Sequence, residues 1–216
     1  MNTRTKVESV SQGLRFFSVV LVMFTCYTLT AQTDAHYVRN FVLVLVHGAW
    51  ADGSGRKNVY GILVKDDLNV SVAQEPETSF QDNVAATRRI LALQNGPCIL
   101  AAHIYGAAVI TEAGTDPSVA GFLYVVDHMP YAGDNEAANL NRVPSDGSRS
   151  AATNRTADGF NYLDPVLYRE YIAACLPGDE AAFGADSQVR IADANFHATI
   201  ATAAWRNKPS WVTVST

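Results

Sequence analysis

The chain has 216 residues, of which 48% are hydrophobic and 17% charged, and its formal net charge is −5. This length suits one α/β domain with a sizeable core. The acidic balance excludes the basic surface that nucleic-acid binding needs. No zinc-ligand spacing, phosphate-binding loop or dinucleotide fingerprint occurs, so we expect no metal and no cofactor. Nothing in the spacing of Cys98 and Cys175 requires a disulfide, although both are available for one.

Residues 1–35 are set apart from the rest of the chain by an apolar run over 16–29 that follows several basic residues. This run is shorter than the roughly 20 residues of a membrane span and suits the apolar part of a signal peptide. Glu8 and Leu29 fit a cleaved leader poorly, so an uncleaved anchor stays open. We predict an exported protein, periplasmic or extracellular, or one anchored to the membrane by this segment; the alternative is a cytoplasmic protein with an apolar N-terminal helix.

Strands alternate with helices from residue 41 onward. Continuous apolar runs at 41–46, 98–102 and 121–127, with a further strand at 70–74, are typical of strands buried in a parallel sheet. Helices are predicted over 58–67, from the Ser79 and Asp82 start signal, and from Gly106 to Gly114. This alternation predicts right-handed crossovers and a mostly parallel sheet between layers of helices.

The alternation stops at 131–208, which we interpret as a helical cap inserted into the domain. Asp164 and Pro165 have the residue types of a helix N-cap and first turn. Further helices are predicted over 179–183 and 196–205. A final strand is predicted over 211–216.

Loops that follow the predicted strands carry the candidate chemistry. In parallel sheets, ligands bind at the carboxyl ends of the strands. The loops that meet there are "HGAW" at 47–50, "HIYGA" at 103–107 and "DHMP" at 127–130. The segment "LAAHIYGAAVI" at 100–110 has the outline of a strand, a tight turn and a helix, with Ile104 at the apex of the turn.

These motifs, in this order, resemble the α/β-hydrolase superfamily, and most closely its small esterase-like members, which include hydroxynitrile lyases and methyl-ester hydrolases. The matching segments are "VLVHGAWADGSG" at 44–55, the stretch 77–114, the stretch 119–139 and "KPSWVTVST" at 208–216. The resemblance implies a three-layer α/β fold with a mostly parallel sheet and a helical cap. It also implies that 36–216 is a truncated hydrolase domain that lacks the last strand and helix.

The resemblance assigns roles to the residues of two loops. It implies that the backbone N–H of Ala49 or Trp50, and that of Tyr105, form an oxyanion hole. The other motif positions are His47, Gly48, His103 and Gly106. The nucleophilic serine is replaced by Ile104, whose side chain has no lone pair. An elbow apex has positive φ, which strains a β-branched residue.

The remaining catalytic positions of the family, an acid and a histidine, would follow residue 216. Asp127, at the end of a predicted strand, is the best substitute acid, and its neighbour His128 would point to the opposite side of the strand if both are extended. His103, beside the apex, and His197, in the cap, are the other histidines considered. We therefore expect an esterase-type hydrolase fold that is catalytically incompetent. The alternatives are a non-catalytic protein that binds a small ester-like ligand in the pocket or associates through an exposed sheet edge, and a lyase-type acid–base enzyme.

Overall fold

The structure, a computed structural model, describes residues 40–126, 128–142 and 152–214. The predicted leader, the candidate acid Asp127 and the last two residues of the final strand lie outside these ranges. Within them, no helix is long and apolar enough to cross a membrane.

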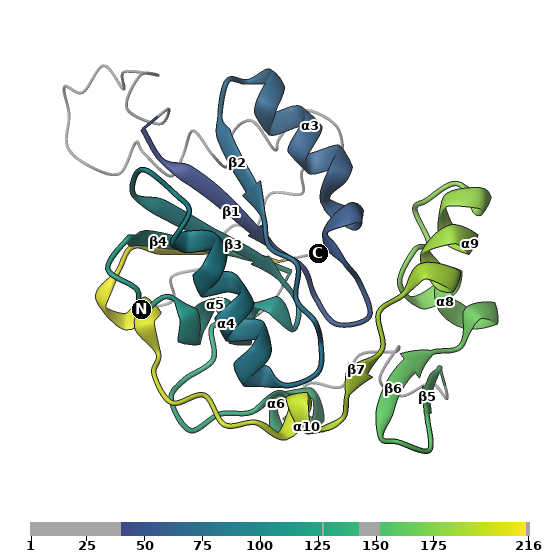
Figure 1. Cartoon of the computed structure of the whole chain (residues 1–216). Coiled ribbons are helices and arrows are strands. Elements are labelled where there is room, and N and C mark those ends of the chain that lie inside the picture. Colours follow the sequence, from purple (N-terminus) through teal and green to yellow (C-terminus); the bar gives the residue numbers. More distant parts are fainter. Residues whose placement is uncertain (1–39, 127, 143–151, 215–216) are drawn as a thin grey trace, which may run out of the picture.

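A five-stranded sheet forms the centre of the domain (Figure 1). Its strands are β1 (Val42–Val46), β2 (Asn69–Val72), β3 (Cys98–His103), β4 (Val119–Val125) and β8 (Ser210–Thr213). They lie in the order β2-β1-β3-β4-β8, and every neighbouring pair is parallel. The predicted parallel sheet is confirmed.

Helices connect these strands as predicted. They are the short 3-10 helix η1 (Gly53–Arg56), α3 (Lys57–Lys65), α4 (Phe80–Leu91) and α5 (Gly106–Ala113). The Ser79 side chain accepts the backbone N–H of Asp82 and so caps α4. Helices α4 and α5 lie side by side against the sheet (Figure 1). Their buried residues join those of β1, β3 and β4 in one hydrophobic core.

Residues 131–208 contain helices and a small second sheet. Among the described residues of this range, the helices are α6 (Glu136–Arg142), α8 (Pro165–Tyr171), α9 (Gly178–Ser187), α10 (Ala194–His197) and the 3-10 helix η2 (Ala204–Asn207). The strands β5 (Thr153–Arg155), β6 (Phe160–Leu163) and β7 (Ile191–Ala192) form an antiparallel sheet, which the sequence analysis did not predict. Asp164 caps α8, and Pro165 is its first residue, as predicted.

The helix predicted over 196–205 is wrong. Helix α10 ends at His197, the backbone is extended at Ala198, and η2 begins only at Ala204. Several backbone N–H groups between them donate to acceptors on other elements, and that of Ile200 donates to the Asp134 carbonyl. Ala201 and Thr202 donate theirs to the Glu112 carboxylate, at 2.8 and 3.0 Å. These bonds hold the segment extended against α5, and helix propensity is overridden.

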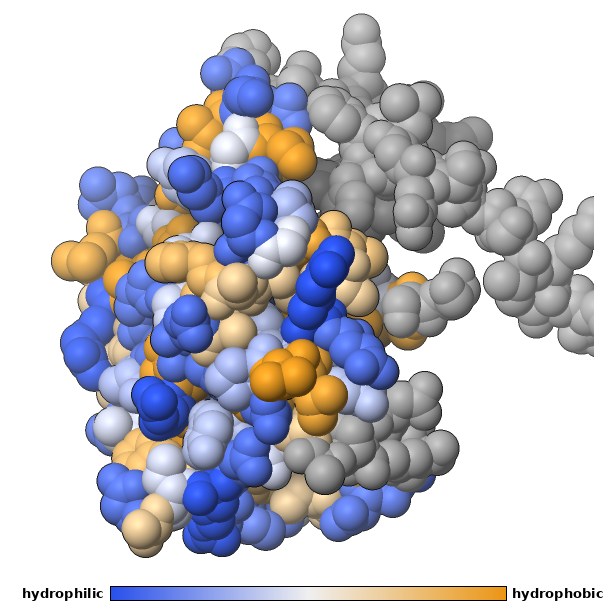
Figure 2. Space-filling model, turned by 90° about the vertical axis from the view of Figure 1, so that its right-hand side faces the viewer, coloured by the Kyte–Doolittle hydropathy of each residue, from blue (hydrophilic) through white to orange (hydrophobic). Residues whose placement is uncertain are grey.

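The cap has its own small core, formed by Leu163, Tyr168, Ala173, Ala181 and Ala185, against which Trp50 of the main domain packs. The face of the molecule on the side of α8 and α9 carries both hydrophobic and hydrophilic side chains (Figure 2). Cys98 is buried and Cys175 exposed, and both thiols are free.

Candidate active site

The turn between β3 and α5 has the backbone expected of a nucleophile elbow. Ile104, at its apex, has φ of +51° and a side chain that is 41% exposed. Helix α5 begins two residues later, at Gly106. A β-branched residue in this left-handed region costs about 1–3 kcal/mol. The fold therefore keeps the strained elbow while the residue presented there has no nucleophilic atom.

The loop after β1 lies directly against the elbow, and two glycines permit the approach. A Cβ on Gly106 would lie 2.5 Å from the carbonyl oxygen of His47, and one on Gly48 would lie 2.8 Å from that of His103. Real Cβ atoms do not come this close to backbone, so each position requires glycine. The motif residues His47, Gly48, His103 and Gly106 are thus brought together.

The backbone groups assigned to the oxyanion hole lie on these two loops. The N–H groups of Ala49, Trp50 and Tyr105 donate to no acceptor in the part of the chain that the structure describes. Trp50 also has a positive φ, of 60°. Its ring packs 5.6 Å from that of Phe196, which in turn lies 5.7 Å from the ring of Tyr105. The aromatic contacts hold both loops against the cap.

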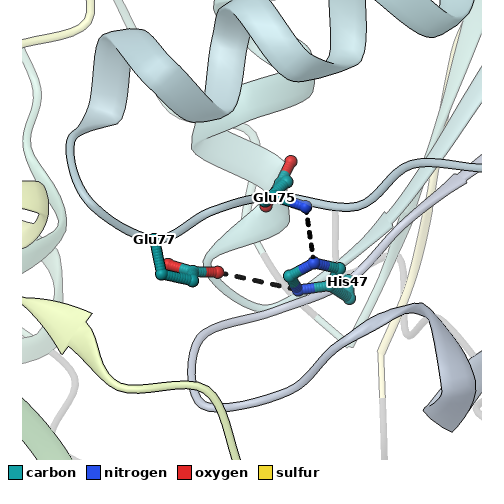
Figure 3. A group of neighbouring side chains, drawn as sticks. All are labelled: His47, Glu75 and Glu77. Carbon is teal, nitrogen blue, oxygen red and sulfur yellow. Dashed lines mark hydrogen bonds and ion pairs between the residues drawn. The ribbon is translucent and has the colours of Figure 1, made fainter.

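His47 is fully buried, and Figure 3 shows its ring beside Glu75 and Glu77. Its Nε2 accepts the backbone N–H of Glu75 at 3.0 Å. In a neutral imidazole the other nitrogen, Nδ1, then carries the proton. Nδ1 lies 3.0 Å from the Gly48 carbonyl oxygen and 3.6 Å from Oε1 of Glu77. Burial lowers the pKa of His47, which keeps the ring neutral.

Two buried carboxyl groups lie beside His47. Burial raises the pKa of Glu77 to about 8. Burial, together with the charge of Glu77, raises the pKa of Glu75 well above its usual value. Each side chain has an oxygen that accepts no hydrogen bond among the described residues, Oε2 of Glu75 and Oε1 of Glu77. A protonated carboxyl group is therefore the expected state of both at neutral pH.

This trio is also the group of described residues whose ligand atoms come close enough to hold a metal ion, within 4.8 Å of one another. Its nitrogen and oxygen donors are of the kind that zinc binds. A metal on Nδ1 of His47 would displace the proton to Nε2, which would then face the N–H of Glu75. In this arrangement the residues do not fit a metal ion.

A buried amide network joins the elbow to the cap. Asn195 of α10 accepts the Tyr105 hydroxyl at 2.9 Å and an N–H of the Asn83 side chain at 3.2 Å. Its own amide donates to the backbone carbonyls of Glu77 and Ala192, at 3.1 and 2.9 Å. Asn195 lies 90 residues after Tyr105 in the sequence, so no local motif could predict this contact.

Of the two histidines considered as bases, His103 is largely buried beside the elbow and His197 is exposed in the cap. Burial, with a contribution from the charge of Arg56, lowers the pKa of His103 to about 4, so that its ring is a weak base. His197 is exposed in the cap, 3.7 Å from Asp193.

The loop after β4 carries a pairing of His128 with a carboxyl group that the sequence did not predict. Nε2 of His128 lies 3.4 Å from Oε1 of Glu136 and 2.7 Å from Nδ2 of Asn139. The register between β3 and β4, in which His103 is opposite Val125, places this loop beside the elbow. The pair could have been suggested only by predicting that a helix begins at Glu136, because the first turn of that helix lies next to His128.

A cavity of about 600 Å³ lies between the loop after β1 and the cap. Its lining includes Trp50, Asp52, Lys57, Tyr168 and Phe183. This volume is in the range of small-molecule sites. The cavity therefore adjoins one of the loops assigned to the oxyanion hole.

Several solved structures are similar to this chain. A pyrethroid hydrolase from Sphingobium faniae JZ-2 has 16% identity and a TM-score of 0.61, over 81% of this chain and 88% of that one. An extracellular α/β-hydrolase from a Paenibacillus species has 16% identity and a TM-score of 0.63, over 80% and 76%. Tomato methylketone synthase I has 14% identity and a TM-score of 0.67, over 82% and 79%. No protein-family model and no curated protein sequence matches the chain. The likeness shows that the chain has the α/β-hydrolase fold.

Proposed function

We propose that this chain binds small carboxylic-ester-like ligands at the carboxyl edge of its sheet and is incompetent as a serine hydrolase. The observation that carries the proposal is Ile104 at the apex of the elbow, with its φ of +51°. Acyl transfer through an enzyme-bound intermediate needs an activated hydroxyl, thiol or similar nucleophile at that place. A hydrocarbon side chain cannot attack an acyl carbon.

Ligand binding is supported by what surrounds the apex. The backbone N–H groups of Ala49, Trp50 and Tyr105, none of which has an acceptor among the described residues, are suited to a carbonyl oxygen. The cavity that Trp50 lines offers about 600 Å³ for the remainder of a small molecule. The fold is shared with a pyrethroid hydrolase and an extracellular hydrolase.

Pre-steady-state kinetics test this proposal. A serine hydrolase that accumulates an acyl-enzyme releases a burst of p-nitrophenol from p-nitrophenyl butyrate, equal to the number of active sites. We expect no burst from this chain, and we expect a non-hydrolysable ketone of similar size to raise its melting temperature. A stoichiometric burst would contradict the proposal, and so would the absence of any ligand-induced stabilisation at saturating ketone.

A second candidate is association through the outer edge of β8. Within the described ranges β8 pairs only with β4, and Val212 and Val214 are 42% and 72% exposed. An unpaired, apolar edge is a template for another strand. Light scattering tests this: we expect a dimer that Val212→Lys converts to a monomer, and a monomeric parent chain would exclude it.

A further inference from the structure

We propose that the cavity between the loop after β1 and the cap binds an organic ammonium group, so that the ligand of this chain is a carbonyl compound with a positively charged tail. The inference rests on the proposed function, because the carbonyl group of such a ligand binds at the elbow. It adds the chemical class of the remainder of the molecule. Trp50 joins the two places: its backbone N–H has no acceptor among the described residues, and the residue also lines the cavity. A single ligand can therefore reach both.

The charged side chains that line the cavity are mainly acidic. Among the described residues of the lining, the acids are Asp52 in the loop after β1 and Asp179 and Glu180 in the first turn of α9, and the base is Lys57. None of these carboxylates forms an ion pair with a described residue. Both hydrogen bonds that Asp52 accepts come from Ser54 and go to Oδ1, so Oδ2 receives none from the described residues. The cavity is therefore suited to a ligand with a positive charge.

Aromatic side chains form other walls of the same cavity. They belong to Trp50, to Tyr168 of α8, which is 8% exposed, and to Phe183 of α9, which is 67% exposed. Burial, with a contribution from the charge of Asp52, raises the pKa of the Tyr168 phenol, which agrees with the placing of both groups in one cavity. The electron-rich faces of aromatic rings attract cations, and tryptophan does so most strongly. The walls and the carboxylates thus favour the same kind of ligand.

The two kinds of wall together select one class of ligand. An anion is repelled by the carboxylates, and a neutral ester leaves their charge uncompensated. A metal ion prefers several oxygen ligands at close range and gains nothing from apolar carbon. An organic ammonium group gives its charge to the carboxylates and packs its carbon atoms on the rings. It is the class that matches both.

Calorimetric titration of the full chain with two matched ketones tests the inference. One is a methyl ketone whose chain ends in a trimethylammonium group, and the other is its neutral isostere, which ends in a tert-butyl group. We expect the ammonium ketone to bind about 10-fold more tightly than the isostere. Salt at about 1 M should narrow this difference, because it screens charges that are more than about 3 Å apart.

Two aspartates that cap helices provide matched variants. Asp52→Asn should lower the preference for the ammonium ketone several-fold, and asparagine retains the cap of η1 because it is an equally good N-cap residue. Asp164→Asn, at the N-cap of α8 and outside the described lining of the cavity, should leave the preference unchanged. Phe183→Leu, at an exposed side chain, should also lower the preference, since leucine keeps an apolar wall but has no ring.

The outcomes separate this inference from the proposed function. Equal affinities of the parent chain for the two ketones would overturn the inference and leave the binding of carbonyl ligands standing. Binding of neither ketone would contradict the proposed function itself. An equal loss of preference in Asp52→Asn and Asp164→Asn would overturn the inference, because it would assign the preference to the net charge of the chain. If Asp52→Asn unfolds, Phe183→Leu decides, and a preference that it leaves unchanged would overturn the inference.

Discussion

The backbone N–H of Glu75 donates to Nε2 of His47 over 3.0 Å, in a part of the core from which water is excluded. This bond fixes the proton of the neutral imidazole on Nδ1 and ties the loop before the elbow to the segment after β2. The histidine of the "HG" motif therefore stabilises the fold, whether or not a ligand is bound.

His47→Ala should therefore destabilise the fold. It leaves the Glu75 N–H buried without an acceptor, which costs about 1–3 kcal/mol, and it opens a cavity as well. Urea unfolding measures the loss. His197→Ala, at an exposed histidine, should change the free energy of unfolding by less than about 0.5 kcal/mol. Equal effects of the two substitutions would show that the buried bond contributes nothing.

The contribution of Glu77 to the stability of the protein should fall as the pH rises from 4.5 to 8. The contribution of His103, whose pKa is lowered to about 4, has the opposite sign below pH 6.5, so the fall is clearest between pH 6.5 and 8. The pKa of Glu77 is about 8 in the folded protein and 4.5 as its ordinary value. Between these values the unfolded chain releases a proton that the folded chain retains, so unfolding becomes easier with increasing pH. The slope from one such group is at most about 1.4 kcal/mol per pH unit, and the loss is complete above pH 8.

Glu77→Gln tests the source of that dependence. We expect the amide to flatten the fall in stability between pH 6.5 and 8, because it carries no proton to lose. Glu170→Gln, at an exposed site in α8, should leave the parent profile unchanged. If the free energy of unfolding of Glu77→Gln falls with pH as steeply as that of the parent, other groups cause the pH dependence.

Ile104→Gly should stabilise the protein. Glycine adopts positive φ without strain, and relief of the strained apex is worth roughly 1 kcal/mol. Thermal unfolding of the variant measures the gain. The matched control is Ile172→Gly, at a similarly exposed isoleucine with φ of −120°, where glycine should destabilise. A destabilised Ile104→Gly variant would mean that contacts of the side chain outweigh the strain.

Asn195→Leu should loosen the cap. The substitution leaves the Tyr105 hydroxyl without an acceptor and removes one of the partners of the Asn83 amide and of the Glu77 carbonyl, at a cost of about 1–3 kcal/mol. Hydrogen exchange should accelerate in α10 and at the start of α5. Asn58→Ala, at an exposed position of α3, is the control. Unchanged exchange in the variant would show that the network does not hold the cap to the elbow.

The parallel sheet and the strain at Ile104 could be predicted because their signals are local. Continuous apolar runs specify buried strands, and the order of the motifs specifies the elbow. The network around Asn195 and the pair of His128 and Glu136 depends on tertiary contacts with no fixed spacing. The extended segment 198–203 was mistaken for a helix because its composition favours one, while the Glu112 carboxylate that captures its N–H groups lies on another element.

The most direct test of the central claim is the mass of the peptide that contains residues 98–114, after the protein has been incubated with a fluorophosphonate and digested. This reagent forms a stable adduct with an activated nucleophile at the elbow of a serine hydrolase. The account predicts an unchanged mass for the peptide that contains residues 98–114, because Ile104 has no atom to react. A stoichiometric adduct on that peptide would contradict it.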